Sequence, residues 1–269
     1  MNKNNLVCFL FTNFDNINQL INFTKYYKKY SSGAQHKLLI CFKLIDDKRI
    51  INLRKYLKNI KYIEFIDPST VNDYDFGSYK RVAKLYLNYN ILFLNSHSYP
   101  NTNSWLSKLL KHFNDKTLVA TSASYESLYT SLKLKKFYKI FSYLKKKLDY
   151  KNKFYPFPNP HIRTANFLIK GSVFLKFIKN KKINNKLDAW KIESGKNNLT
   201  NFFKHKNYKV FIINLDGHKF TLNDCKFSET FNYRNQNKCI ISDKHTRKYI
   251  KLTNSKKKIF EFNTWGHNI

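Results

Sequence analysis

The fold is decided by the stretch LVCFLFTNFDNINQLINFTKYY, residues 6–27. Its first six residues are all apolar, which is typical of a strand that is buried on both faces. The polar segment TNFDN follows, and apolar residues then recur at helical spacing from Ile17 until SSG at residues 31–33 ends the helix. The first unit of the chain is therefore a buried strand, a polar tip and a helix.

The same unit recurs along the first 95 residues. Further strands are predicted at Lys37–Leu44, 61–68 and Ile91–Leu94, and further helices at Lys48–Lys58 and 81–90. This alternation predicts an α/β fold with a mostly parallel central sheet, flanked by helices and joined by right-handed crossovers. Ligands of such sheets bind beyond the carboxyl ends of the strands, so the polar tips mark the expected binding edge.

The second half of the chain continues the pattern less regularly. A strand is predicted in 116–127, a strand and a short helix in 159–177, a loop and a helix in 188–206, a strand in 207–214 and a hairpin in 230–250. We find no internal repeat and no long linker. The simplest organisation is one domain, residues 1–215, with a C-terminal extension, residues 216–269, packed on it.

Composition allows several explanations for a formal charge of +33 on 269 residues. With 42% hydrophobic and 17% aromatic residues the chain is globular, and only six of its 50 basic residues are Arg. The Lys excess fits the coding bias of an AT-rich sequence, or attraction to an anionic membrane or a polyanionic glycan. Nucleic acid is the least favoured partner, because no helical stretch has the Arg-rich face that base recognition uses.

The cysteines and the N-terminal residues bear on the expected location of the protein in the cell. The four cysteines lie far apart without a Cys-x-x-Cys motif, which favours buried, reduced thiols. The N-terminal apolar run is too short for a signal peptide, and no run approaches the roughly 18 apolar residues of a membrane span. We expect a cytoplasmic protein, with a peripheral position on the inner face of the cytoplasmic membrane as the alternative.

The Lys-rich segment Leu128–Tyr150 has apolar residues at roughly helical intervals. It can be an amphipathic helix packed on the sheet. It can also be an interfacial helix that brings the protein to an anionic membrane.

The segment DYDFGSYKR, residues 73–81, is a candidate phosphate site. Asp75 can cap the helix that follows, Gly77 allows close backbone approach, and Lys80 and Arg81 add cations near the helix start. A capped surface helix is the simpler alternative.

Four blocks in order resemble the GT-A glycosyltransferases of family 2 and of the rhamnan-synthesis type. They are DYDFGSYK, then ILFLNSHSYPNTNSWLSKLL, then NFLIKGSVFLKF, and WKIESGKNNLTNFFKHKNYKVFII. The resemblance covers Leu6 to Asn214 and implies a nucleotide-sugar half, residues 1–115, and an acceptor half, residues 116–215. NYRNQN and NTWG in the tail resemble an extension of some bacterial proteins of this type.

The resemblance implies transfer of a sugar from a nucleotide diphosphate to an acceptor hydroxyl, with inversion, in bacterial surface polysaccharide synthesis. Glu193 matches the family's acidic residue before a helix and is the expected catalytic base; alternatively it only favours a helix N-terminus. The expected nucleotide-sugar contacts are Thr12, Asn13, Asp15, Asp46, Asp67, Asp75, Lys80, Arg81, Asn95, Ser96 and His97. The acids among them could instead cap loops or helices. The expected acceptor contacts are His161, Arg163 and Asn166, with a glycan or lipid-linked acceptor as partner.

The triplet Asn95-Ser96-His97 departs from the family, whose members commonly place an Asp there to hold Mg²⁺ or Mn²⁺. Three possibilities stay open. His97 can be a Mn²⁺ ligand, although Mg²⁺ prefers oxygen; His97 and nearby Lys can stabilise the leaving group without metal; or the site is degenerate. The last possibility keeps open a second function, a GT-A-fold protein that binds nucleotide or glycan without transfer.

Overall fold

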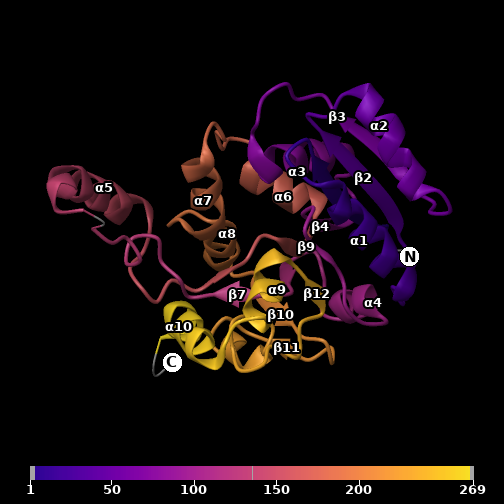
Figure 1. Ribbon diagram of the computed structural model, residues 1–269. Helices are drawn as coiled ribbons and strands as arrows, with labels where there is room; N and C mark the ends of the chain where they lie inside the picture. The colour runs from indigo at the N-terminus through magenta and orange to yellow at the C-terminus, as the bar shows by residue number, and fades with distance from the viewer. Residues whose placement is uncertain (1–3, 135, 267–269) are drawn as a thin grey trace.

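The computed structural model describes residues 4–134 and 136–266 and contains an eight-stranded sheet (Figure 1). Its strands run in the order β11-β10-β6-β9-β4-β1-β2-β3. Their bounds are β1 Asn5–Thr12, β2 Lys37–Lys43, β3 Ile63–Asp67, β4 Asn90–Leu94, β6 Thr117–Ala120, β9 Asn166–Lys170, β10 Lys209–Ile213 and β11 Lys219–Phe220. Strand β9 is antiparallel to β4 and β6, and β11 is antiparallel to β10. The predicted α/β class with a mostly parallel sheet is confirmed.

Helices cover both faces of this sheet. Strand β1 shows why, because Leu6, Cys8 and Leu10 lie in one buried cluster while Val7, Phe9 and Phe11 lie in the other. The first cluster is covered by α3 (Tyr74–Leu85), α6 (Gly171–Ile178), α7 (Lys186–Ser194) and α8 (Leu199–His205). The second is covered by α1 (Ile17–Lys29), α2 (Asp47–Arg54) and α4 (Trp105–Leu110). The unbroken apolar runs of the sequence are therefore strands buried on both faces.

Three predicted elements are corrected by the structure. Helix α3 begins at Tyr74, so most of the segment DYDFGSYK is helical instead of preceding the helix. The predicted loop that contains Glu193 is helix α7. The predicted hairpin in 230–250 is wrong: β12 (Ile241–Ser242) pairs with β5 (Tyr99–Pro100), and helix α9 (Lys244–Ile250) follows. Two-residue strands leave no periodic signal in the sequence.

The chain after β11 folds back over the sheet edge. Helix α10 (Asn254–Trp265) ends at Trp265, whose ring centroid lies 5.1 Å from that of Tyr125. Trp265 Nε1 donates to the carbonyls of Phe231 and Asn232, each at 3.1 Å. Together with the β12–β5 pair, this packing brings α9 next to the end of β4.

The segment predicted as one helix over Leu128–Tyr150 is helical only from Phe137. It consists of the 3₁₀ turn η2 (Phe137–Lys139) and α5 (Ile140–Lys153), which extends away from the sheet (Figure 1). Tyr150 is the one buried residue of α5. The alternative of a helix packed on the sheet is therefore wrong for this segment. Within the described ranges no helix has the length and apolarity needed to cross a membrane.

Candidate active site

The polar tips of β1 and β4 meet at one edge of the sheet, as the sequence predicts. Asp15 joins them: its Oδ2 accepts hydrogen bonds from the backbone N and Oγ1 of Thr12, at 2.8 and 2.7 Å. Its Oδ1 accepts from Ser96 Oγ at 2.6 Å. The two predicted contacts Asp15 and Ser96 therefore belong to one hydrogen-bonded unit, because β1 and β4 are parallel neighbours.

Arg49 of α2 holds the other side of the β1–α1 loop. Its guanidinium donates to the carbonyl oxygens of Asn13 and Asp15, at 2.7 and 2.6 Å. Asp46 is exposed and caps α2, accepting from the backbone N of Arg49 at 2.8 Å. For Asp46 the structure favours the cap over a nucleotide contact. The sequence reasoning did not single out Arg49, because nothing in an exposed helix pattern marks its reach to another loop.

The end of β3 carries a compact charged cluster of Asp67, Asp73, Lys43 and Arg81. Arg81 Nε lies 2.5 Å from Asp67 Oδ1, and its Nη1 lies 2.6 Å from Asp73 Oδ2. Lys43, almost fully buried, also donates to Asp73. Burial acts to raise the pKa of Asp73, but hydrogen bonds from Arg81 and Lys43 hold that pKa below its ordinary value.

This cluster corrects the predicted phosphate site. The cation of Arg81 is already paired with two carboxylates, and Lys80 Nζ donates to the carbonyl of Lys179 at 2.7 Å. Gly77 does allow a close approach, but of the Asp73 carboxylate, which a Cβ at Gly77 would overlap. Asp67 is likewise committed to Arg81 and Ser78. The polar groups of this segment are thus engaged within the protein around the start of α3.

Asp75 lies in the first turn of α3 and differs from Asp73 in its surroundings. The N-cap position belongs to Asp73, so the predicted capping role of Asp75 is wrong. Burial is the main reason that the pKa of Asp75 is raised to about 6; the charge of Lys43 opposes this rise, and the charges of Asp15 and Glu193 add to it. The charges of two other predicted site residues therefore act on the Asp75 carboxylate.

His97 lies just after the end of β4, and its Nδ1 is 3.3 Å from the side-chain amide of Gln19 on α1. Burial lowers the pKa of His97; Asp15 opposes this effect, and Lys244 and Arg247 add to it. Asn95 Oδ1 accepts from the backbone N of His97 and from Ser98 Oγ, at 3.2 and 2.8 Å. The Asn95 oxygen thus supports its own loop.

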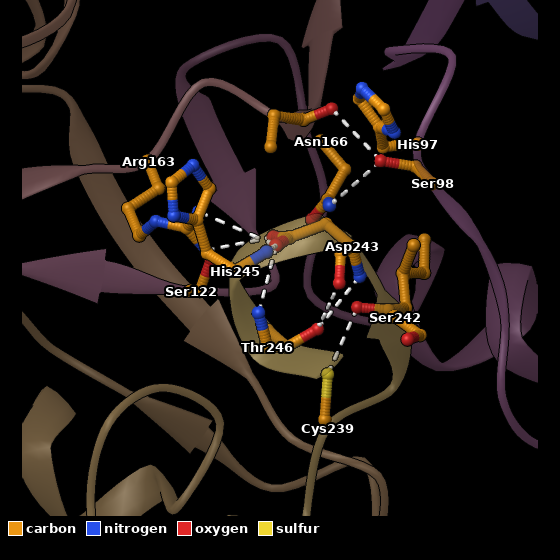
Figure 2. A network of polar contacts seen from close by, with 12 residues as sticks. His97, Ser98, Ser122, Arg163, Asn166, Cys239, Ser242, Asp243, His245 and Thr246 are labelled. Carbon is orange, nitrogen blue, oxygen red and sulfur yellow. Dashed lines mark hydrogen bonds and ion pairs between the residues drawn. The ribbon is translucent and has the colours of Figure 1, made fainter. Parts of the chain in front are cut away.

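Helix α9 places two cations beside His97. Arg247 donates to the carbonyl of His97 at 3.0 Å and lies over the Tyr99 ring, 4.6 Å from its centroid. Lys244, the first residue of α9, is exposed. Asp243 orients the helix through a capping box with Thr246 and pairs with Arg163 at 2.7 Å (Figure 2). These two cations were not predicted as site residues, because residues 230–250 were predicted to form a hairpin.

The residues near His97 do not fit a resident metal ion. Across residues 4–134 and 136–266, no group of three or more His, Cys, Asp or Glu side chains is arranged to hold one. The carboxylate of Asp15 is engaged by Thr12 and Ser96, and Asn95 by its own loop. We therefore derive no step through Mg²⁺ or Mn²⁺.

A cavity of about 390 Å³ opens beside the sheet edge and contains the predicted base. Its lining includes His161, Arg163, Trp190, Glu193, Phe231 and His245. Burial lowers the pKa of both His161 and His245. His161 Nδ1 donates to the carbonyl of Asn159 at 2.7 Å, which leaves its Nε2 free of a proton in the neutral ring. The structure thus brings His161 and Arg163 together with Glu193.

The third predicted acceptor residue, Asn166, lies elsewhere. It is buried at the start of β9, and its Nδ2 lies 3.4 Å from Ser98 Oγ (Figure 2). The lining also includes Glu126, whose pKa is raised by burial, and Trp190. The sequence reasoning did not name these two residues; a tryptophan three positions before an expected base was the available signal.

Glu193 lines the cavity and is also linked to the end of β4. Its Oε1 accepts from the backbone N of Thr164 at 3.0 Å, and the carbonyl of the next residue, Ala165, accepts from the backbone N of Asn95 at 3.0 Å. Its charge acts to raise the pKa of both Asp75 and His161. It lies in the last turn of α7, so the alternative of a helix N-terminus stabilised by Glu193 is wrong.

Comparisons with known proteins give fold likenesses only. No protein-family model and no curated protein sequence matches the chain. Among solved structures it is similar to the apo-form glycosyltransferase GlyE of Streptococcus pneumoniae TIGR4, with 14% identity and a TM-score of 0.43 over 78% of this chain and 45% of GlyE. It is similar to the galactosyltransferase LgtC in complex with donor and acceptor sugar analogs, with 13% identity and a TM-score of 0.43 over 78% and 73%.

The apo structure of WbbM, a bifunctional glycosyltransferase, is similar at 9% identity and a TM-score of 0.43, over 97% of this chain and 44% of WbbM. The chain thus spans less than half the length of GlyE and of WbbM. These solved structures are glycosyltransferases, the class that the sequence motifs resemble. At TM-scores of 0.43 and identities of 9 to 14%, these likenesses carry no argument about this chain, and the activity has to come from the site.

Proposed function

We propose that the protein is a glycosyltransferase that moves a sugar from a nucleotide diphosphate donor to an acceptor hydroxyl with inversion, in bacterial surface polysaccharide synthesis. The observation that carries the proposal is that Glu193 lines the cavity and is hydrogen-bonded to Thr164, next to the residue whose carbonyl accepts from Asn95 at the end of β4. The donor lies at the ends of β1 and β4, beside Asp15, Ser96 and His97. The acceptor lies in the cavity.

The proposed reaction is one displacement. The acceptor hydroxyl oxygen attacks the anomeric carbon, its proton passes to the Glu193 carboxylate, and the bond from the anomeric carbon to the diphosphate oxygen breaks. The diphosphate leaves with the bonding electron pair. A base on the cavity side and a leaving group on the strand-tip side favour attack opposite the leaving group, which inverts the anomeric configuration.

The negative charge that develops on the diphosphate needs a positive partner. Arg247 donates to the carbonyl of His97, and the charges of both Lys244 and Arg247 act to lower the pKa of His97. Preorganised cations at a developing charge are among the strongest contributions to catalysis. We assign this task to Lys244 and Arg247, which keeps the second of the three possibilities for His97: stabilisation of the leaving group without metal.

The acceptor side is formed by His161 and Trp190. The unprotonated Nε2 of His161 can accept a hydrogen bond from a hydroxyl, and the Trp190 ring is half-buried at the cavity, where an apolar sugar face can pack. A saccharide presents both chemistries. This supports a glycan acceptor, free or lipid-linked.

The test is release of nucleotide diphosphate from a panel of nucleotide sugars, with simple sugars as acceptors and with Mn²⁺ or EDTA present. We expect release from one donor class, unchanged by EDTA, and a product whose anomeric signals in NMR spectra are inverted. A retained anomer would contradict the displacement. Donor binding by calorimetry without turnover of any donor would instead support the nucleotide-binding protein without transfer.

A further inference from the structure

Residues 136–153, here called the arm, have no role in the proposed reaction. It comprises η2 and α5 and leaves the body of the protein (Figure 1). Its two ends are tied together at the base, where Ser127 Oγ donates to the carbonyl of Tyr155 at 2.5 Å and the backbone N of Phe157 donates to Thr130 Oγ1 at 2.9 Å. The arm is therefore attached by a fixed base.

Large apolar side chains of the arm point into solvent. Phe137 is 82% exposed, Phe141 84% and Leu148 64%, and Leu144 is exposed as well. Phe141, Leu144 and Leu148 are spaced three and four residues apart, so they share one face of α5. An isolated exposed apolar residue needs no explanation, but a row of them on a projecting helix has a substantial solvation cost unless something covers it.

Positive charge surrounds this apolar face. The arm contains seven lysines and a single acidic residue, Asp149, which is paired with Lys153 at 2.6 Å. A helix that combines lysines with exposed aromatic and leucine side chains is typical of interfacial helices that bind anionic bilayers. A second copy of the chain is a poor occupant, because two arms of the same sign would repel each other.

The base of the arm coincides with the rim of the acceptor cavity. Ser127, Leu128 and Ser131 line the cavity, and Ser127 also forms the hydrogen bond to Tyr155 at the base of the arm. The backbone N of Lys196, two residues after α7, donates to the carbonyl of Lys153 at 2.9 Å. If the arm binds to a surface, the mouth of the cavity is therefore held close to that surface.

We propose that the arm docks on an anionic lipid bilayer through Phe137, Phe141, Leu144 and Leu148, and so presents the cavity to an acceptor carried on a membrane lipid. The docking stands on the arm alone. The lipid-linked acceptor rests on the proposed function. The inner face of the cytoplasmic membrane has the required negative charge.

The test is flotation of the full chain with phosphatidylcholine vesicles, with and without phosphatidylglycerol. We expect binding only with phosphatidylglycerol, and a partition coefficient at least about tenfold lower for the triple variant Phe137→Ser, Phe141→Ser, Leu148→Ser. The matched control is Ile51→Ser, Leu85→Ser, Ile259→Ser, whose side chains are 57%, 62% and 58% exposed on other elements. The control should bind like the unmodified protein.

A second measurement reports which part of the molecule meets the lipid. Tryptophan fluorescence of a Leu144→Trp protein should be quenched by vesicles of brominated phosphatidylglycerol, whereas that of an Ile51→Trp protein should keep the quenching of the unmodified protein. Equal flotation of the arm variant and the control, or no dependence on phosphatidylglycerol, overturns the docking. A lipid-free oligomer that the arm variant abolishes would also overturn it and point to a second copy.

These outcomes are separable from failure of the proposed function. Vesicle binding needs no donor, and release of nucleotide diphosphate in solution should be the same for the arm variant and the control. If the protein floats with vesicles but turns over no nucleotide sugar, the proposed sugar transfer is wrong and the docking stands. If it turns over a nucleotide sugar in solution but does not float, the docking is wrong and the proposed transfer stands.

Discussion

Asp73 and Asp75 lie two residues apart at the start of α3 but belong to two different regions. Asp73 belongs to the cluster at the end of β3, where Lys43 and Arg81 hold its pKa low despite partial burial. Burial is the main reason that the pKa of Asp75 is raised to about 6, and the charges of Asp15 and Glu193 add to the rise. The first turn of α3 and its cap therefore carry two different carboxylates. The charge of Asp73 is balanced by cations, whereas the charged form of Asp75 is disfavoured.

The difference separates structural from chemical roles. In the β3 cluster each carboxylate has a cation, so the charges stabilise the fold and are not available to a ligand. Around Glu193, burial and the Glu193 charge raise the pKa of Asp75 and of Glu126, which is costly for stability and is typical of sites that move protons or bind ligands. Five variants test this comparison.

The largest expected effect is on stability and comes from Arg81→Ala. Removing this cation leaves the buried Asp67 carboxylate uncompensated, and breaking such a buried pair costs about 3 to 5 kcal/mol. Urea unfolding followed by circular dichroism measures the loss. Lys84→Ala, one turn along the same helix, is the control and should unfold like the unmodified protein; an Arg81→Ala protein of unchanged stability would remove the structural role of the cluster.

The next effect is on activity. Glu193→Gln removes the proton acceptor but keeps the side-chain volume, and we expect kcat for sugar transfer to fall at least about 100-fold, the usual range for a general base. The free energy of unfolding should change little, because an amide oxygen can still accept from Thr164. Glu64→Gln, far from the cavity, is the control. Full transfer by Glu193→Gln would end the assignment.

The third effect distinguishes the two aspartates by sign. The pKa of Asp75 is raised in the folded protein, so its favourable protonated state is present below about pH 4 and is lost as pH rises through about 6. Asp75→Asn should therefore be more stable than the unmodified protein at pH 7 by about 2 to 3 kcal/mol, and equal to it below pH 4.

Asp73→Asn should behave in the opposite way. The pKa of Asp73 is lowered on folding, so its contribution is present at neutral pH and is lost as pH falls below its ordinary range. Denaturant unfolding of both variants across pH 4 to 8 measures the two slopes. If both variants lose stability at pH 7, the two regions do not differ in the way described.

The smallest effect concerns the leaving group. Lys244→Ala removes one exposed cation beside His97 and should lower kcat about tenfold with little change in KM for the acceptor. The loss should shrink at high salt, because exposed charges are screened. Lys248→Ala, on the next turn of α9, is the matched control, and equal rates for the two variants would assign the diphosphate to other groups.

Much of the fold could be predicted because its signal is local. The apolar runs at Leu6–Phe11, Lys37–Leu44 and Ile91–Leu94 became β1, β2 and β4 within a residue at either end. Their polar ends meet at one edge because parallel strands align their carboxyl ends, and the Asp15–Ser96 hydrogen bond follows from that. The hairpin in 230–250 was wrong because β12 pairs with β5, a partner some 140 residues away.

The alternation of strands and helices, and therefore the edge where polar residues gather, can be read from the chain alone, since hydrophobic periodicity is a property of neighbouring residues. Which of those polar residues have partners is known only from the folded arrangement. Arg81 pairs with Asp67 and Asp73, Glu193 accepts a hydrogen bond from Thr164 but forms no ion pair within the described residues, and Arg247 of α9 donates to the carbonyl of His97. Charge pairing depends on distance in space and on burial, and neither is encoded at fixed separation along the chain.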